Sequence, residues 1–490
     1  MLRKIRIILS LVFFFLITLL FLDFTGIFQV WFGWMAKIQL LPAVLAMNVG
    51  VFVGLMALTL VFGRFYCSVI CPLGVMQDLF SCLGGKFRKN RFRYRKAHQV
   101  LRYVVLTVFI LLMGFGVHAV ALLIAPYSAY GRIATQLFAP VYRWGNNLLA
   151  ALAAHYDSYA FYPVEVWVKS LPALIVAVLT FAVVAVWAFF GGRAWCSNLC
   201  PVGSVLGFIS RFSLLKPSID TSRCAHCGLC EKNCKASCID SSAQRIDYSR
   251  CVGCMDCLEN CRAGAIRYRP AVKIERKKAE SVMDSGKRDF LKMSGLVAGS
   301  LALESAALKV DGGLAVIEDK QPAVRSLPLR PAGSQGQRHF ESHCTACQLC
   351  VAACPGQVLR PSSELSRLMQ PEMSFERGYC RPECTRCSEV CPTGAILPVT
   401  VEEKTSIQTG HAVWIEKNCL VRRDGVHCEA CVSHCPTGAI QLVRPEKGFG
   451  LAVPAIDTAA CIACGACEYY CPARPFSAVY VEGHRLSKNI

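Results

Sequence analysis

The chain has 490 residues, of which 54% are hydrophobic, and a formal net charge of +20. This hydrophobic content exceeds what a soluble chain normally needs, so part of the chain is expected to lie in lipid. The 30 cysteines exclude a disulfide framework, because the chain is long and most of them fall into tight C-x-x-C runs, which are typical of metal ligands.

Four apolar stretches approach the length needed to cross a bilayer, at about 5–22, 40–62, 103–125 and 171–190. They predict four transmembrane helices. The basic run "KFRKNRFRYRKAHQVLR" lies between the second and third, whereas the other connections hold few cations. The positive-inside rule therefore places the N-terminus and residues 63–102 in the cytoplasm. Contact with lipid headgroups explains the basic run better than contact with nucleic acid does.

One pattern, G-R-x-x-C-S-x-x-C-P-x-G, occurs after the second and after the fourth of these helices, in "GRFYCSVICPLG" and "GRAWCSNLCPVG". Two helix hairpins in the same orientation predict a pseudo-twofold axis along the membrane normal, on which the thiols of the two copies converge. One hypothesis is a four-thiolate metal or redox site built from Cys67, Cys71, Cys196 and Cys200. The other is structural, with Arg64 and Arg193 tying helix ends to the headgroups. Both remain open at this point.

A first soluble block, residues 216–280, contains two C-x2-C-x2-C-x3-C runs. In this spacing three thiolates hold one cubic 4Fe–4S cluster and the fourth reaches a neighbouring cluster, whereas structural zinc uses two pairs of ligands. The proline that commonly follows the fourth cysteine is replaced by Lys235 and Arg262. Cys238 competes with Cys234 as a ligand, and we favour Cys234. The predicted ligands are Cys224, Cys227, Cys230, Cys234, Cys251, Cys254, Cys257 and Cys261.

A second cysteine-rich block, residues 341–490, repeats the theme four times, and each of its runs ends in Cys-Pro. This internal repeat is typical of ferredoxin half-units. Six oxidised clusters would lower the net charge to roughly +8, which removes most of the reason to expect a nucleic-acid partner. The predicted ligands are Cys344, Cys347, Cys350, Cys354, Cys380, Cys384, Cys387, Cys391, Cys419, Cys428, Cys431, Cys435, Cys461, Cys464, Cys467 and Cys471.

The fold class predicted from these features is an α-helical polytopic membrane domain with four transmembrane helices (1–215) plus two α+β ferredoxin-like iron–sulfur modules (216–280 and 341–490). Residues 281–340 are predicted to be a linker that contains "GKRDFLKMSGLVAGSLAL". The second module reaches the periplasm only if residues 293–308 cross the bilayer; otherwise both modules are cytoplasmic. We favour the periplasm.

The membrane part with its two C-x3-C-P motifs and the first double-cluster block resembles the NapH family of membrane quinol dehydrogenases. Residues from about 281 onward resemble its partner NapG, a four-cluster ferredoxin, so that the chain resembles a fusion of the two. The segment "KRDFLK" resembles a twin-arginine export signal, although Lys287 replaces the first arginine and Glu304 interrupts the apolar region. The resemblance implies six 4Fe–4S clusters, quinol as electron donor and a terminal reductase or cytochrome as acceptor.

The predicted function is therefore a multi-pass electron conduit of the inner (cytoplasmic) membrane that carries electrons from quinol through its clusters, as in periplasmic nitrate reductase systems. An alternative is an assembly factor that reduces copper or another cofactor for a partner respiratory enzyme. His118, inside the third apolar stretch, is a candidate acceptor for a quinol proton, although a packing role explains it better.

Overall fold

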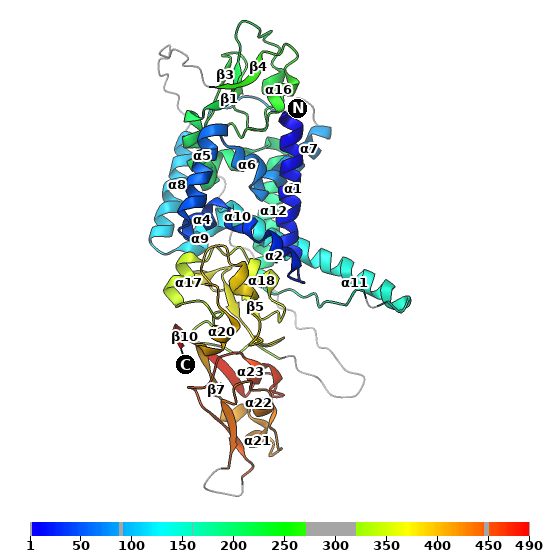
Figure 1. The fold of residues 1–490 in the computed structure, drawn as a ribbon, viewed down its shortest axis with the longest axis vertical. Coiled ribbons are helices and arrows are strands. Elements are labelled where there is room, and N and C mark those ends of the chain that lie inside the picture. The colour runs from blue at the N-terminus through cyan, green and yellow to red at the C-terminus, as the bar shows by residue number, and fades with distance from the viewer. Residues whose placement is uncertain (1, 88–91, 159, 271–319, 445–449, 490) are drawn as a thin grey trace, which may run out of the picture.

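The computed structural model describes residues 2–87, 92–158, 160–270, 320–444 and 450–489. Three parts follow one another along the long axis of the molecule (Figure 1). A small cysteine-rich module (residues 215–270, the first module) lies at one end. A helical domain lies in the middle, and a larger cysteine-rich module (residues 320–489, the second module) lies at the other end.

The helical domain contains two successive sets of helices. The first set consists of α1 (Leu2–Leu22), α2 (Ile27–Phe32), α3 (Trp34–Lys37), α4 (Leu40–Leu45), α5 (Val49–Phe62), α6 (Phe65–Val69) and α7 (Pro72–Phe87). The second set consists of α8 (Gln99–Gly114), α9 (His118–Ile124), α10 (Pro126–Ile133), the π-helix η1 (Ala134–Phe138), α11 (Ala139–His155), α12 (Leu171–Gly191), α13 (Ala194–Asn198), α14 (Pro201–Ile209) and the 3-10 turn η2 (Ser210–Phe212).

Two of the four predicted spans are single helices, α1 and α12, and both are long and apolar enough to cross a membrane. The predicted helices at 40–62 and 103–125 are instead each divided in two. Between α4 and α5 the backbone turns at Met47 (φ 51°), and Asn48 caps α5 by accepting a hydrogen bond from the Val51 N–H at 3.2 Å. Between α8 and α9 it turns at Gly116 (φ 79°). Hydropathy alone did not indicate these breaks, because the turn residues are themselves mostly apolar.

The duplicated motif folds in the same way in both sets. Gly63 and Gly192 adopt positive φ and end α5 and α12, after which a one-turn helix, α6 or α13, carries the first cysteine. Pro72 and Pro201 then begin α7 and α14, as the sequence predicts, because proline suits the first turn of a helix. The repeat in sequence is thus a repeat in structure.

The first module consists of short helices and two-stranded antiparallel sheets. Strand β1 (Leu215–Ile219) pairs with β4 (Ile266–Pro270), and β2 (Ile239–Asp240) pairs with β3 (Arg245–Ile246). The helices are α15 (Leu229–Lys232) and α16 (Asp256–Asn260).

The second module has the same character, in agreement with the predicted α+β class. Its sheets pair β5 (Leu359–Pro361) with β6 (Pro371–Met373), β7 (Ile407–Trp414) with β10 (Val479–Asn489), and β8 (Ile440–Val443) with β9 (Val453–Ile456). Its helices are α17 (Gln337–His343), α18 (Leu349–Ala353), α19 (Arg386–Val390), α20 (Val401–Ser406), α21 (Leu420–Arg423), α22 (Ala430–Ser433) and α23 (Ala466–Tyr470), with 3-10 turns η3 (Leu365–Arg367) and η4 (Glu416–Asn418).

The predicted linker at 281–340 falls into two parts. Residues 281–319, which include the export-signal-like segment and the possible crossing at 293–308, lie outside the described residues. Residues 320–340 do not form a linker, because they pack onto the second module: Arg325 pairs with Glu468 at 2.6 Å, and Lys320 donates to the Tyr469 carbonyl at 2.8 Å.

The helical domain and the second module share one buried core, which includes Tyr66 and Tyr127 on one side and Cys347 and Cys350 on the other. The two parts approach closely at Gly131 of α10. A β-carbon at this position would lie 2.3 Å from the Cys347 carbonyl oxygen. Only glycine allows the two backbones to come this close.

We expect Gly131→Ala to loosen this contact, because the added methyl group overlaps a backbone atom that cannot rotate away. The apparent melting temperature of the detergent-solubilised protein should fall by about 5 °C or more. Gly145→Ala in α11 is the matched control, since a β-carbon there meets nothing within 4 Å. Equal melting temperatures for Gly131→Ala and Gly145→Ala would contradict this account of the interface.

Candidate metal centres

A shared local geometry explains why C-x2-C-x2-C runs gather their sulfurs. In four of the runs the residues before and after the second cysteine both adopt left-handed φ, for example Ala346 (50°) and Gln348 (64°) around Cys347. A short helix starts directly afterwards and carries the third cysteine, as α18 carries Cys350. The chain therefore wraps around one point, and three sulfurs face it. The same pair of left-handed residues flanks Cys227, Cys254 and Cys464.

In the first module the fourth cysteine of each run lies near the first three cysteines of the other run. This proximity is visible in the electrostatic effect of one sulfur on the pKa of another. Burial, together with the sulfurs of Cys224 and Cys261, raises the pKa of Cys230 to about 11. Burial and the sulfurs of Cys254, Cys251 and Cys234 likewise raise the pKa of Cys257. The two thiol groups are thus interleaved, as the spacing predicts.

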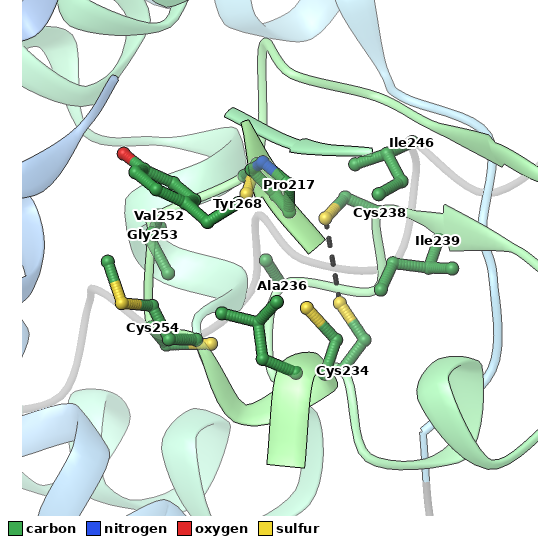
Figure 2. A pocket seen from close by; sticks show the side chains of 14 residues that line it. Pro217, Cys234, Ala236, Cys238, Ile239, Ile246, Val252, Gly253, Cys254 and Tyr268 are labelled. Carbon is green, nitrogen blue, oxygen red and sulfur yellow. Dashed lines mark hydrogen bonds between the residues drawn. The ribbon is translucent and has the colours of Figure 1, made fainter. Parts of the chain in front are cut away.

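The choice between Cys234 and Cys238 can now be described in space. Figure 2 shows both side chains in one apolar pocket with Cys254, and their sulfurs are 3.5 Å apart. Cys234 lies within electrostatic range of Cys251, Cys254 and Cys257, the first three cysteines of the other run. This proximity favours Cys234 as the ligand, and the assignment stays a prediction.

In the second module, too, the fourth cysteine of a run lies with the cysteines of another run, so the four cysteines of one run do not form one group. Cys391 lies with the first three cysteines of the preceding run, since burial and the sulfurs of Cys347, Cys344 and Cys391 raise the pKa of Cys350. Two pairs of runs make four groups: Cys344, Cys347, Cys350 and Cys391; Cys354, Cys380, Cys384 and Cys387; Cys419, Cys428, Cys431 and Cys471; and Cys435, Cys461, Cys464 and Cys467.

The groups follow one another along the molecule. The group containing Cys347 contacts the helical domain through Gly131. The next two groups are joined by the backbone, because the Cys380 N–H donates to the Cys464 carbonyl at 2.9 Å. Figure 1 shows α18 nearest the helical domain and α22 and α21 farthest from it, which places the Cys419 group at the tip.

A further thiol group forms between the two copies of the duplicated motif. Cys200 is fully buried and lies within electrostatic range of Cys67, Cys71 and Cys196. The predicted convergence of the four thiols is therefore present in the structure. Each copy contributes two of the four cysteines.

Two buried arginines each reach from one copy of the motif to the other. Arg64 of the first copy donates to the Cys196 carbonyl at 3.0 Å, and Arg193 of the second donates to the Cys67 carbonyl at 2.5 Å. Each guanidinium also lies against a glycine of the partner copy, where a β-carbon on Gly203 or Gly74 would approach within 3 Å of it. The arginines are therefore internal clamps between the two copies. The structural hypothesis, in which they reach the headgroups, is wrong in this respect because both are 0% exposed.

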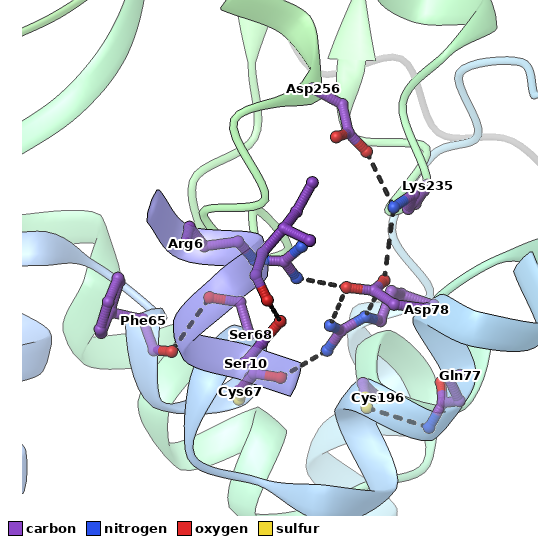
Figure 3. A network of polar contacts seen from close by, with 12 residues as sticks. Arg6, Ser10, Phe65, Cys67, Ser68, Gln77, Asp78, Cys196, Lys235 and Asp256 are labelled. Carbon is purple, nitrogen blue, oxygen red and sulfur yellow. Dashed lines mark hydrogen bonds and ion pairs between the residues drawn. The ribbon is translucent and has the colours of Figure 1, made fainter. Parts of the chain in front are cut away.

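The environments of the two arginines differ in charge. Asp78 receives two hydrogen bonds from Arg193, at 2.9 and 2.7 Å, and also pairs with Arg6 (Figure 3). Lys235 reaches both Asp78 (3.7 Å) and Asp256 (3.0 Å), which links the helical domain to the first module. Arg64 has no carboxylate partner among the described residues and lies instead near Cys67, Cys196 and Cys200.

The sequence pattern marks Lys235 only as the residue that replaces the proline after the fourth cysteine, and it does not identify Asp78 or Gln77. Gln77 donates to the Cys196 sulfur at 3.3 Å. Gln77 and Asp78 could have been found from the sequence, because they form a polar pair among the apolar residues of the helix that follows the first copy of the motif. His118 lies at the break before α9 with its ring nitrogen 3.3 Å from the Met113 sulfur, and its role in proton transfer stays a prediction.

The donor set fits iron–sulfur clusters. Thiolates are the ligands that such clusters use, and backbone N–H groups point at several of the sulfurs, as Ala478 does at Cys471 (3.2 Å) and Ala346 at Cys344 (3.4 Å). In the described parts of the chain, no three His, Cys, Asp or Glu side chains close around the position of a single metal ion.

These interleaved groups define an iron–sulfur protein of the polyferredoxin class. A family model described as "4Fe-4S dicluster domain" matches residues 343–395 and 426–474. A second, described as "4Fe-4S binding domain", matches residues 44–90 and 173–219, which are the two copies of the duplicated segment.

Among the relatives, the methylamine utilization ferredoxin-type protein MauM of Methylophilus methylotrophus is 34% identical over 32% of this chain and 72% of its own length. The ferredoxin-type protein NapG of Escherichia coli is 30% identical over 38% of this chain and 81% of its own length. The ferredoxin-type protein NapF of Escherichia coli is 29% identical over 32% of this chain and 87% of its own length. The chain belongs to this Nap/Mau family of ferredoxin-type electron-transfer proteins.

The interleaving makes a sharp prediction about single ligand changes. We expect Cys391→Ser and Cys344→Ser to remove the same cluster, because both sulfurs face one point, while Cys354→Ser should remove a different one. EPR spectra of the dithionite-reduced protein, with iron analysis, would show the same lost signal in the first two variants and a loss of about 4 iron atoms in each. If Cys391→Ser instead matched Cys380→Ser, the groups would follow the order of the sequence and the interleaved arrangement would be wrong.

Proposed function

We propose that the chain is a membrane-bound conduit that carries electrons from quinol, across the helical domain, to a terminal reductase or cytochrome. The observation that carries this proposal is the series of thiol groups along the long axis. Two groups lie in the first module, one lies between the copies of the duplicated motif and four lie in the second module. A series that spans all three parts of the molecule suits passage of electrons from one end to the other.

The arrangement of the three parts supports a multi-pass protein of the inner membrane, with the helical domain in the bilayer. The described part of the basic run packs on the first module, where the Tyr94 N–H donates to Glu231 at 2.9 Å and Arg102 donates to the Ser249 hydroxyl at 3.0 Å. By the positive-inside rule this end is cytoplasmic. The exposed Trp31 and Trp144 belong to α2 and α11 at the other end, where the second module lies, which suits a periplasmic location for that module.

Six interleaved groups would hold six 4Fe–4S clusters, or about 24 iron atoms. Each bound cluster can accept and donate one electron. The protein's own residues fix the positions of the thiolates and exclude water, and their N–H groups and nearby cations stabilise negative charge on sulfur. Lys404 is one such cation: it donates to the Cys384 carbonyl at 2.5 Å and lies near Cys380 and Cys387.

The group of Cys67, Cys71, Cys196 and Cys200 is proposed to be a further metal or redox centre. A buried guanidinium without a counter-charge is costly, yet Arg64 is fully buried and has no carboxylate partner in the described parts of the chain. Deprotonated thiols bound to a metal would supply the missing negative charge. Four thiols held only for packing would leave that charge unbalanced.

The names of the relatives support electron transfer and name no common partner. NapG and NapF are named ferredoxin-type proteins, and MauM is named a methylamine utilization ferredoxin-type protein. Another relative, YccM of Escherichia coli, is named a putative electron transport protein and is 27% identical over 40% of this chain and 47% of its own length. The terminal partner of this chain is accordingly proposed at the level of a reductase or cytochrome.

The test of the conduit uses the full chain in lipid nanodiscs with a reduced quinol analogue as the electron donor. We expect Cys71→Ser and Cys200→Ser each to slow electron transfer between the clusters of the first module and those of the second at least tenfold, and the double variant to add little, because both changes disrupt one shared centre. Cys82→Ser is the matched control, since Cys82 is exposed and belongs to none of the groups.

Several outcomes would count against the conduit. Independent, additive losses in the two variants would argue against a shared centre, and unchanged electron transfer between the modules in both would return the motif to a structural role. Reduction of Cu(II) that requires Cys67, in a protein that quinol does not reduce, would favour the assembly-factor alternative.

The proposed sidedness has its own test. A reporter fused after Ile490 should show alkaline phosphatase activity, because that enzyme matures only in the periplasm, whereas a fusion after Pro270 should not. Green fluorescence from a cytoplasmically matured reporter after Ile490 would place both modules on the inner side.

A further inference from the structure

A cavity of about 300 Å³ lies where the helical domain meets the second module. Its walls come from the π-helix η1, from α11, from the extended segment 166–169 and from the start of α12. The lining is mainly apolar and includes Trp144 and Trp167, together with two cations, Arg143 and Lys169. A volume of this size is at the lower end of the range for small-molecule sites in proteins.

Two polar groups of cavity-lining residues lack a hydrogen-bond partner among the described residues, the Thr135 hydroxyl and the Arg143 Nε. Thr135 is 7% exposed. A buried hydroxyl normally finds a partner, because leaving it unpaired is costly. Thr135 lies in a single-turn π-helix, an element that is frequent at functional sites. These features point to a ligand with a hydrogen-bonding group.

The cavity adjoins the cysteine run nearest to the helical domain. Lys169 lines the cavity and donates to the Val351 carbonyl at 2.9 Å, and Val351 follows Cys350 directly. Gln136 donates to Gln348 at 2.8 Å, and Gln348 is the left-handed residue between Cys347 and Cys350. Two cavity residues therefore contact the segment that carries these thiols. A molecule in the cavity would lie close to the thiol group.

The outer wall of the cavity suits access from lipid. Helix α11 projects sideways from the helical domain (Figure 1), and several of its apolar side chains are exposed, among them Val141 (64%), Trp144 (64%) and Leu148 (65%). Exposed apolar and aromatic residues of this kind are typical of a helix lying in the membrane interface. Asn147 fixes the helix to the returning segment through two hydrogen bonds of 2.8 Å with Val164.

We propose that this cavity binds the headgroup of a quinol, with its isoprenoid tail passing along α11 into lipid. The apolar part of a quinol ring suits the mainly apolar lining of the cavity. Its oxygens match the Thr135 hydroxyl and the Lys169 ammonium. The assignment rests on the proposed quinol-driven function and adds the place where the quinol binds.

A second groove provides matched controls. It is larger, about 680 Å³, and lies between α2, α3 and α19. Three charged side chains line it, Lys37, Arg386 and Glu389, and one of them is a carboxylate, whereas the charged residues that line the cavity are the cations Arg143 and Lys169. Lys37 and Thr25 there correspond in residue type to Lys169 and Thr135 in the cavity.

The test measures binding of a fluorescent hydroxyquinoline-N-oxide, a quinol analogue, to the full chain in nanodiscs, without any turnover. We expect Thr135→Val, which keeps the side-chain shape, and Lys169→Met each to raise Kd about 3- to 10-fold. Lys37→Met should change Kd by less than about twofold. An azidoquinone photoprobe should label residues 134–144 or 166–169.

Labelling confined to 25–37 or 386–390, or an unchanged Kd in both Thr135→Val and Lys169→Met, would overturn the assignment. If quinol still reduced the protein in that case, the conduit would stand and only the site would be wrong. If dithionite reduced the protein but quinol neither bound to it nor reduced it, the proposed function would fail together with the site.

Discussion

The exchange of two buried arginines between the copies of the duplicated motif is the constraint on which the helical domain depends. Arg64 and Arg193 each reach across to a backbone carbonyl beside a cysteine of the other copy. A guanidinium can do this only where the neighbouring backbone is very close, and Gly74 and Gly203 provide the room. Because the clamps are reciprocal, the four thiols are held facing one another. Duplication of the motif is therefore a requirement of the site, since one copy lacks the partner for its arginine.

The difference in charge between the two clamps connects the parts of the molecule. Asp78 balances Arg193 and also receives Arg6 and Lys235, and Lys235 continues to Asp256 of the first module. A single carboxylate thus joins α1, α7, the duplicated motif and the first module. Arg64 is balanced by no carboxylate among the described residues and faces thiols instead. This asymmetry in an otherwise symmetric site is the main physical reason to assign negative charge to the four-thiol group.

At the other end of the helical domain the contact with the second module is made by backbone and core side chains. Gly131 lies against Cys347, while Tyr66 and Tyr127 belong to the same buried core as Cys347 and Cys350. The thiol groups of the helical domain and of the second module thus share one continuous hydrophobic core. An apolar, low-dielectric interior is the environment expected around redox centres. The cavity beside η1 opens onto this same junction, so quinol binding there and electron transfer would use one part of the fold.

The sequence by itself determined the local parts of this protein. Spacing fixed which three cysteines of a run gather, because the left-handed residues around Cys347 and its equivalents wrap the chain within a few residues. Length and apolarity were sufficient for α1 and α12, and Pro72 and Pro201 marked the helix starts. The tertiary structure alone decided the rest: which of the four runs of the second module pair, so that Cys391 joins Cys344, that α4 and α8 end early, and that Lys235 reaches Asp78. These depend on contacts between residues far apart in the chain, and a linear pattern carries no information about which distant backbone leaves no room for a β-carbon at Gly131.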